Sequence, residues 1–354
     1  MSGCDVVRDV KNTLLIALTY VATVIGAGFA SGQEILSYFV VYGKKSIYSL
    51  MGVCVLFVVC ALCVMLRVDK NDINGFGEYI CSIAPKKACS FIKICVMLFM
   101  LVSFCSMVSG SGELFYSALK TSRVFGMCTM MLLCVVVFWF DIKAILTVNA
   151  ILAPIMAVSL FLLGIYSFVF RDVATFGSGL ITSLCKNYIV SGLIYASYNL
   201  FSAIVIIAGL KDVITSKRVC IGASIIGGGA LFIISASIWA AIKLYYGKIV
   251  LGEIPLLSIV SRNGKTIEII YSLSLYFSMF TTAISCGYGV FNYLMTSLKI
   301  KKLTAIIILI AVSCPILFLG FSGIVKYVYS LFGYLGIILI VYVLCDGVKM
   351  MGEK

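Results

Sequence analysis

The feature that most constrains this chain is VATVIGAGFASGQEILSYF at Val21–Phe39, a membrane-like apolar stretch that Gly26, Gly28 and Gly32 interrupt. A helix that only anchors a protein has no reason to open inside the bilayer. Backbone N–H and C=O groups freed there are tolerated only where they are buried in protein or line a cavity. Interrupted helices at this depth are where membrane carriers hold small solutes. The stretch therefore favours a solute site.

Composition places the whole chain in a membrane. Of 354 residues, 62% are hydrophobic and only 12% are charged, and the mean hydropathy is +1.16. At about 20 apolar residues for each helical span, there is room for about ten spans and no soluble domain. No GxxxxGK[ST] phosphate loop occurs, so ATP-driven pumping by this chain is not expected.

The net charge of +13 is interpreted as a topology signal rather than as affinity for nucleic acid, because Lys and Arg gather at the ends of membrane helices. Their modest excess on one set of connections predicts a multi-pass protein of the cell membrane with both termini in the cytoplasm. The chain has no His, so any proton coupling would fall on carboxylates. The Cys residues lie mostly in apolar runs, which predicts neither a zinc site nor a disulfide framework.

The apolar runs predict an all-α fold in one membrane domain covering 1–354. The candidate spans are 11–41, 46–66, 88–119, 123–140, 143–170, 187–210, 217–246, 266–297, 302–320 and 323–348. Two connections, Arg67–Lys87 and Gly247–Lys265, are long enough to contain short helices of their own. In the fifth span, Asn149 and Pro154 predict a kink.

An internal repeat is indicated by two similar segments five spans apart. GAGFASGQ at Gly26–Gln33 aligns with GLIYASYN at Gly192–Asn199, and both lie in the middle of a span. An odd number of spans inverts the second copy in the membrane. The prediction is a 5+5 inverted repeat, with spans 1–5 in 11–170, spans 6–10 in 187–348, and spans 1 and 6 broken.

TYVATVIGAGFASGQEI in span 1, YASYNL in span 6 and IPLL in the last long connection resemble the YkvI-type membrane proteins. That family is related to the amino acid–polyamine–organocation transporters and is similar in architecture to LeuT-fold carriers. The resemblance implies ten transmembrane helices, alternating access and a central site between spans 1, 3, 6 and 8.

The break in span 1 would supply both kinds of helix end. The half that ends near Ile25 presents carbonyls, and the half that begins near Ser31 presents N–H groups. Such a pair suits a zwitterion, of which an amino acid is the simplest. The alternative is that the glycines only let helices pack closely. The predicted substrate-binding residues are Gly26, Ala27, Gly28, Phe29, Ser31, Tyr195, Ser197 and Asn199.

Two carboxylates are candidates for coupling. Glu34 lies within the broken span, where a buried acid is costly and is expected to meet a proton or the ammonium of a substrate. The alternative is structural, because Ser31 and Glu34 form the S-x-x-E pattern of a capping box. Glu113, near the end of span 3, is the second candidate; alternatively it reaches the membrane interface.

The family resemblance also implies a sodium site. It would combine the hydroxyls of Thr281 and Thr282 with the carbonyls of Ser278, Ala22 and Ile25. Five oxygens suit a hard cation. The alternative is that these hydroxyls bond only to carbonyls of their own helix. No other cofactor is expected.

These observations favour a secondary active transporter, a symporter of an amino acid or similar small amine-bearing solute coupled to sodium or protons. The alternative is a nutrient receptor of the same fold that binds solute without net transport. A channel is disfavoured because no filter loop is apparent, and an enzyme because no nucleophile–base pair or metal cluster is apparent. The expected partners are the solute and the lipid bilayer, not nucleic acid, and the oligomeric state stays open.

Overall fold

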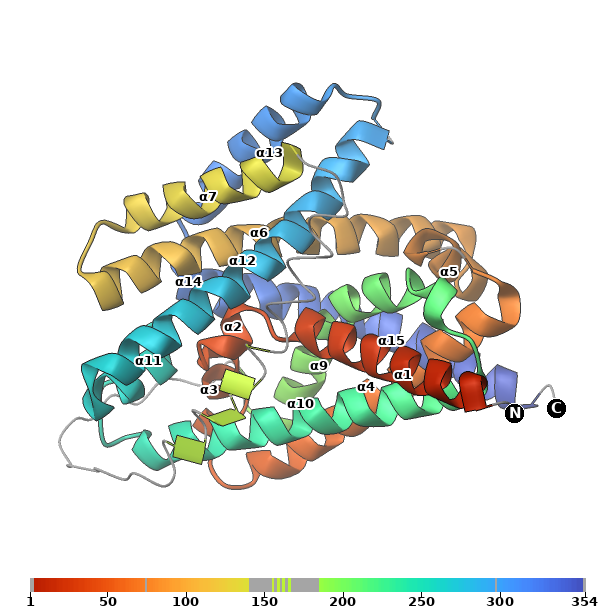
Figure 1. Ribbon diagram of the computed structural model, residues 1–354, viewed down its shortest axis with the longest axis horizontal. Helices are drawn as coiled ribbons and strands as arrows, with labels where there is room; N and C mark the ends of the chain where they lie inside the picture. Colours follow the sequence, from red (N-terminus) through yellow and green to blue (C-terminus); the bar gives the residue numbers. More distant parts are fainter. Residues whose placement is uncertain are drawn as a thin grey trace.

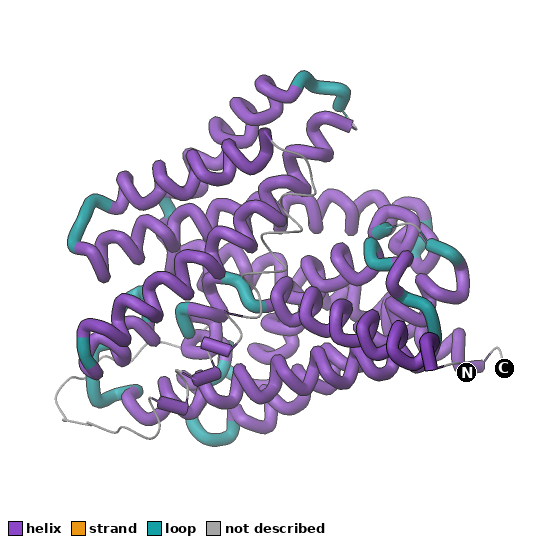
Figure 2. The backbone as a smooth tube through the Cα atoms, viewed as in Figure 1, coloured by secondary structure: helices purple, strands orange, loops and turns teal. Residues whose placement is uncertain are grey.

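A computed structural model of the protein describes residues 3–73, 75–139, 185–296 and 298–352, with scattered residues between 155 and 166. The described part consists of helices joined by turns and loops, with one isolated bridge between Tyr246 and Ile249 and no strand (Figure 2). The expected fifth span, 143–170, with Asn149 and Pro154, lies largely outside the described residues.

The helices follow the expected runs closely in the described ranges. In chain order they are α1 (Gly3–Val24), α2 (Ala27–Ala30), α3 (Gln33–Tyr38), η1 (Val40–Tyr42), α4 (Ser46–Asn71), α5 (Phe76–Ile83), α6 (Lys86–Leu119), α7 (Arg123–Trp139), α9 (Tyr188–Ala208), η2 (Lys211–Val213), α10 (Lys217–Tyr245), α11 (Pro255–Val260), η3 (Ser261–Asn263), α12 (Lys265–Thr296), α13 (Lys302–Leu317), α14 (Gly320–Gly323), the π-helical turn η4 (Ile324–Val328) and α15 (Tyr329–Gly352). The two long connections contain α5 and α11, as predicted.

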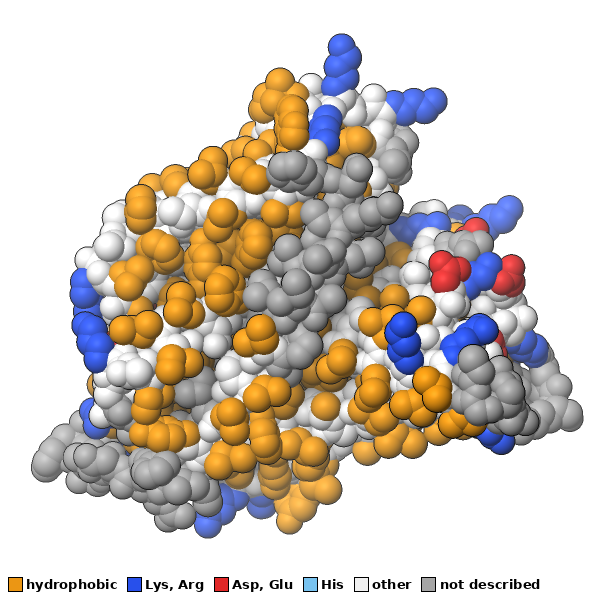
Figure 3. Space-filling view, in the orientation of Figure 1, with side chains coloured by type: hydrophobic (Ala, Val, Ile, Leu, Met, Phe, Trp, Pro, Cys, Tyr) orange, Lys and Arg blue, Asp and Glu red, His pale blue; other side chains and the backbone are white. Residues whose placement is uncertain are grey.

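Membrane-spanning character is clear for six segments of the described chain: α4, α6, α9, α10, α12 and the α14–α15 run. The apolar helices α7 and α13 are shorter, with 17 and 16 residues. The predicted count of ten spans stays a prediction. In Figure 3, hydrophobic side chains cover the middle of the visible face, and Lys and Arg gather near its margins, as expected for a chain surrounded by lipid.

The spans form two groups with the interrupted helix between them. In one group α1, α4, α9 and α10 pack together, with α15 against α9 and α4; in the other α6 packs with α7, α12 and α13. The short helix α2 contacts α6 and α12, whereas α3 contacts α9 and α10. Figure 1 shows α2 and α3 in the middle of the molecule and the two termini at the same end.

The predicted break in span 6 is wrong. The helix α9 runs without interruption through Tyr195–Asn199. Its glycine, Gly192, lies against α4, where a Cβ would collide with the Ser49 side chain. No Gly or Pro occurs between Leu193 and Ala208, so nothing in the sequence opens the backbone there. The similarity between the two segments reflects small residues used for packing in the second copy.

Close packing also fixes the other face of α9. A Cβ at Gly333 would lie 2.6 Å from the carbonyl oxygen of Ile194, and one at Gly336 would lie 2.9 Å from that of Ser197. Glycines on α15 therefore bring it against the backbone of α9, as small residues do in membrane bundles. At another place, a disulfide joins Cys81 of α5 to Cys89 of α6, a bond that the sequence analysis did not anticipate.

We predict that Gly336→Leu destabilises the protein, because the new side chain would have to push α15 away from the Ser197 backbone. Overpacking of this kind costs about 1–3 kcal/mol. Gly229→Leu on α10 is the matched control, since nothing lies within 4 Å of a Cβ there. Thermal unfolding in detergent measures both variants. Equal unfolding midpoints for Gly336→Leu and Gly229→Leu would contradict the packing assigned to α15.

Candidate functional site

The first interruption of span 1 is a change in hydrogen-bond partners directly after α1. The N–H of Gly26 donates to the carbonyl oxygen of Val24 at 2.9 Å instead of continuing the helix to Ala22. The next N–H, that of Ala27, donates to Sδ of Met107 on α6 at 3.3 Å. The carbonyl of Ala22 therefore loses its helical donor, as expected at a helix end. The break predicted from the glycines of span 1 is confirmed.

The second interruption lies at Ser31–Gly32 and is held by neighbouring helices. Gly32 has φ of +79°, the left-handed region that favours glycine, and it precedes α3. The Tyr271 hydroxyl of α12 donates to the Ala30 carbonyl at 2.9 Å, and the Leu256 N–H of α11 donates to the Ser31 carbonyl at 3.0 Å. These two bonds fix the direction in which α3 leaves the turn.

Glu34, in the first turn of α3, is 3% exposed and folds back over α2. A Cβ at Gly28 would overlap the Glu34 carboxylate, so this position requires glycine. The expected capping box does not form. Gly32 rather than Ser31 is the N-cap of α3, and the Ser31 hydroxyl donates to Gly28 and accepts from the N–H of Gln33. The structural interpretation of Glu34 as a helix cap is therefore wrong.

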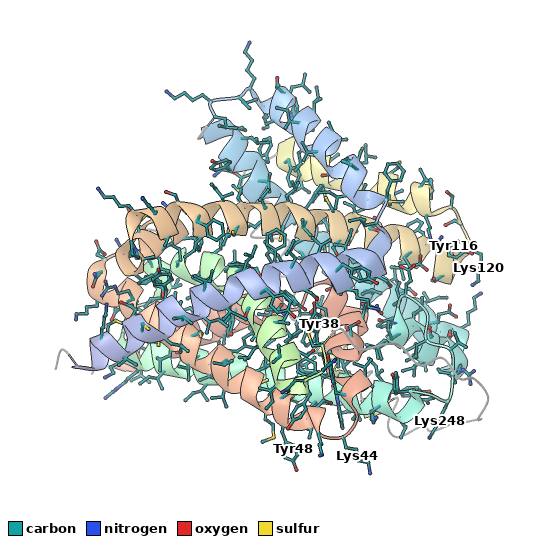
Figure 4. The ribbon with its side chains drawn as sticks, turned by 180° about the vertical axis from the view of Figure 1, so that it is seen from behind. Tyr38, Lys44, Tyr48, Tyr116, Lys120 and Lys248 are labelled. Atoms are coloured by element: carbon teal, nitrogen blue, oxygen red, sulfur yellow. A yellow bond between two sulfur atoms is a disulfide. The ribbon has the colours of Figure 1, made fainter. Side chains whose placement is uncertain are left out.

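Aromatic rings surround this carboxylate. We call Glu34, Tyr38, Tyr195, Tyr198 and Tyr329 the Glu34 cluster. The Tyr198 ring centroid lies 5.6 Å from those of Tyr38 and Tyr195 and 5.1 Å from that of Tyr329. The Tyr198 side chain approaches the Glu34 carboxylate. The other three tyrosines are near enough for a charge on Glu34 to act on their hydroxyl groups. Figure 4 shows Tyr38 in the interior of the molecule.

No cation accompanies the Glu34 carboxylate among the described residues. The ion pairs found there join Arg67 to Asp346, Arg123 to Glu113 and Lys211 to Asp72. Within the same part of the chain, Oε2 of Glu34 and the buried hydroxyls of Tyr195 and Tyr198 have no hydrogen-bond partner. A buried ionised group costs several kcal/mol unless it is paired, and buried polar atoms without partners point to a missing ligand. The cluster therefore contains a buried acid that the described residues leave without a counter-charge.

The predicted residues of span 6 divide between two faces of α9. Tyr195 belongs to the cluster, and the Asn199 side chain approaches Glu34 while its amide donates to the Tyr195 carbonyl at 3.0 Å. Ser197 is not brought to the cluster: its hydroxyl bonds to its own helix at Leu193, and its backbone lies against α15. Of the remaining predicted residues, Ala27 and Phe29 are fully buried.

The candidate sodium residues meet where α12 crosses the first break. The Ser278 hydroxyl donates to the Ile25 carbonyl at 3.4 Å, and the Thr281 hydroxyl donates to the Ser278 carbonyl at 3.0 Å. Cγ2 of Thr282 faces Gly26, 3.7 Å from where a Cβ would lie. Of the five expected oxygens, the Ser278 hydroxyl and the Ile25 carbonyl are thus brought together across the two helices, whereas the Thr281 hydroxyl bonds to its own helix and Thr282 presents its methyl group to the break. Occupancy by sodium stays a proposal.

Glu113 is not brought to the cluster. Its Oε2 accepts from Nε of Arg123 at 2.7 Å, and its Oε1 accepts from the Ser117 hydroxyl at 2.7 Å. Both oxygens are therefore engaged: Oε2 joins α6 to the start of α7, and Oε1 bonds within α6. The sequence alone could not reveal this pairing, because nothing in the spacing of Glu113 and Arg123 indicates which way the two helices turn.

Comparison with known proteins gives relatives of the same kind. The chain is 25% identical over 334 residues to the uncharacterized membrane protein YkvI of Bacillus subtilis (strain 168), covering 93% of this chain and 94% of YkvI. It is 23% identical over 331 residues to YyaD of the same organism, covering 92% of this chain and 94% of YyaD. These two proteins are homologues of the chain, so the resemblance to YkvI-type proteins is confirmed. No protein-family model matches.

Solved structures show the same fold. MhsT in complex with L-phenylalanine has a TM-score of 0.64 at 14% identity, covering 95% of this chain and 91% of MhsT. The manganese transporter of Eremococcus coleocola (mutant H236A) has a TM-score of 0.59 at 13% identity, covering 93% of this chain and 78% of the transporter. Mhp1 in its inward-facing conformation has a TM-score of 0.59 at 13% identity, covering 91% of this chain and 72% of Mhp1. These neighbours are LeuT-fold transporters, not enzymes.

We predict that Gly28→Ala destabilises the protein because the new methyl group displaces the Glu34 side chain. In a Glu34→Ala background the same substitution has room and should cost less, by a coupling energy of about 0.5–3 kcal/mol. Gly26→Ala is the control, since a Cβ there meets only ordinary contacts at 3.6–3.7 Å. A double-mutant cycle on unfolding midpoints measures the difference. Additive effects would contradict the fold-back of Glu34 over Gly28.

Proposed function

We propose that this protein is a secondary active transporter, working by alternating access, for an amino acid or a similar small amine-bearing solute. One observation carries the proposal: an interrupted span places the buried carboxylate of Glu34, without a cation, among four tyrosine rings. An ammonium group would supply the missing charge, and ring faces attract cations as well. The shared fold with LeuT-type transporters supports transport over simple binding.

The amine is better supported than a carboxylate on the same solute. The continuous α9 removes the second pair of helix ends on which a zwitterion site would rely. In span 1, Glu34 already occupies the first turn of α3, where a substrate carboxylate would otherwise be stabilised. MhsT in its complex holds L-phenylalanine, which carries both groups. We therefore keep amino acids in the proposed class, with the ammonium group as the part that the Glu34 cluster would bind.

Sodium or protons would drive the transport. The oxygens at Ile25, Ser278 and Thr281 support a sodium site, and Glu34 supports a proton site. We further propose that the protein lies in the cell membrane with both termini in the cytoplasm. Their position at one end of the molecule supports this placement (Figure 1), as does the weak excess of Lys and Arg on that side.

We predict that proteoliposomes containing the protein accumulate a labelled amine or amino acid against its gradient and lose this ability when the ion gradients are dissipated. Glu34→Gln should abolish accumulation, because a neutral amide cannot pair with an ammonium. Glu268→Gln, at the start of α12 and outside the cluster, is the control. Scintillation counting over a panel of solutes measures uptake. Saturable binding without accumulation would indicate a receptor instead.

We predict that Thr281→Val weakens stabilisation by sodium, because it removes one oxygen of the proposed site while keeping the shape of the side chain. A ligand bound only by the folded form raises the unfolding midpoint by mass action. Thermal shifts in sodium chloride against choline chloride measure the effect. Thr19→Val, whose hydroxyl bonds to its own helix at Leu15, is the control. An identical sodium-dependent shift in both variants would exclude this site.

A further inference from the structure

We propose that Glu34 binds a proton and the ammonium group of the substrate in turn, so that the protein exchanges one for the other. The inference rests on the proposed function and specifies its coupling. It would make the protein an exchanger of protons and amines rather than a symporter, with one charge crossing in each direction for every cycle.

The basis is that Glu34 differs from the other buried acids. Three acidic side chains are buried in the described part of the chain: Glu34, Glu113 and Asp346. Glu113 pairs with Arg123 at 2.7 Å, and Asp346 lies 3.5 Å from Arg67. Each of these acids thus has its counter-charge on a neighbouring helix. Glu34 has none, so its charge must be neutralised by something that arrives from outside the fold.

The groups that face Glu34 cannot supply the charge. On α3 the facing group is Tyr38, on α9 they are Tyr195, Tyr198 and Asn199, and on α15 it is Tyr329. On α2 it is Gly28, and α10 presents Ile242 to the adjacent Gly32. The nearby cation of η4 is used elsewhere: Nζ of Lys326 lies 5.5 Å from the ring centroid of Tyr327, a residue that is 65% exposed. Phenols and amides carry no positive charge at ordinary pH.

One carboxylate can be neutralised by one cation at a time. When an ammonium group enters, its N–H groups pair with the carboxylate, and the proton held by the carboxyl group leaves to water on that side. When the ammonium leaves on the other side, a proton from that side adds to the carboxylate. The cluster offers such a guest further contacts, because the hydroxyls of Tyr195 and Tyr198 lack partners in the described part of the chain.

Obligatory exchange follows from the cost of the empty state. A bare carboxylate in a dry site is unfavourable, so the conformational change between the two access states is slow unless Glu34 holds a proton or an ammonium. The carrier then crosses the membrane loaded in both directions. A symporter would instead need the proton and the amine bound together, and Glu34 is the only buried acid of the described residues without a paired cation.

Two measurements test the proposal. In the first, dicyclohexylcarbodiimide, which reacts with protonated carboxyl groups in apolar sites, is added to the purified full chain, and labelling of Glu34 is read by mass spectrometry. We expect labelling that falls severalfold as the pH rises, and protection by 2-phenylethylamine at fixed pH. Glu34→Gln should remove the labelled peptide. Absence of labelling across pH 5–9, or protection by sodium but not by the amine, would overturn the proposal.

In the second measurement, proteoliposomes with acidic interiors are given labelled 2-phenylethylamine or L-phenylalanine, and internal pH is followed with a trapped dye. We expect uptake accompanied by loss of internal protons, in excess of that seen with Glu34→Gln and with protein-free vesicles, which measure passive entry of the neutral amine. Uptake driven by sodium with no proton movement would overturn exchange and leave the proposed transport intact. Labelling and protection at Glu34 without uptake of any solute would overturn the proposed transport itself.

Discussion

The structure depends on one buried acid, the Glu34 side chain, which has no counter-charge among the described residues and lies between two groups of membrane helices. Its position is set by backbone rather than by side chains. Gly28 leaves the space into which the side chain folds, and the left-handed turn at Gly32 directs α3 toward α9. A carboxylate in such surroundings is unstable unless a cation accompanies it. The proposed exchange of a proton for an ammonium group at Glu34 rests on this cost.

The sequence predicted this part of the molecule well because glycine affects the backbone directly. Gly26, Gly28 and Gly32 lie close together in one apolar run, and the structure has breaks at Ile25–Gly26 and Ser31–Gly32. Glycines alone do not open a membrane helix, because α10 is continuous through Gly227–Gly229. The prediction of a break in span 6 was wrong because it rested on side chains rather than on glycines. Tyr195–Asn199 resembles the break only in side-chain size, and side chains of that size are equally suited to packing against α15. Similarity between repeats therefore predicted which helices are central, but not which are interrupted.

The sequence could not predict which side chains on different helices contact each other. The pairing of Glu113 with Arg123 and the gathering of four tyrosines around Glu34 depend on how α6, α7, α9 and α15 are placed in space. The capping box failed for a nearer reason: Ser31 and Glu34 have the right spacing, yet the Ser31 N–H that Glu34 would accept from already donates to the Ala27 carbonyl at 2.8 Å, and Gly32 is the N-cap of α3. Local patterns predict local bonds only where no other group competes.

Bonds to distant elements also hold the two ends of α3, the helix that carries Glu34. The Tyr38 hydroxyl, on the same helix as Glu34, contacts the Ser330 hydroxyl at 2.8 Å and donates to the Val325 carbonyl at 3.3 Å in the π-helical turn η4. A π-turn leaves carbonyls outside the regular ladder, so such bonds can break without unfolding the span. With the Leu256 N–H bonded to the Ser31 carbonyl at the other end, α3 is held at both ends by distant elements, and all six of its residues are buried. In the proposed transport cycle, these bonds at the two ends of α3 are the ones that would have to change when Glu34 turns to the other side of the membrane.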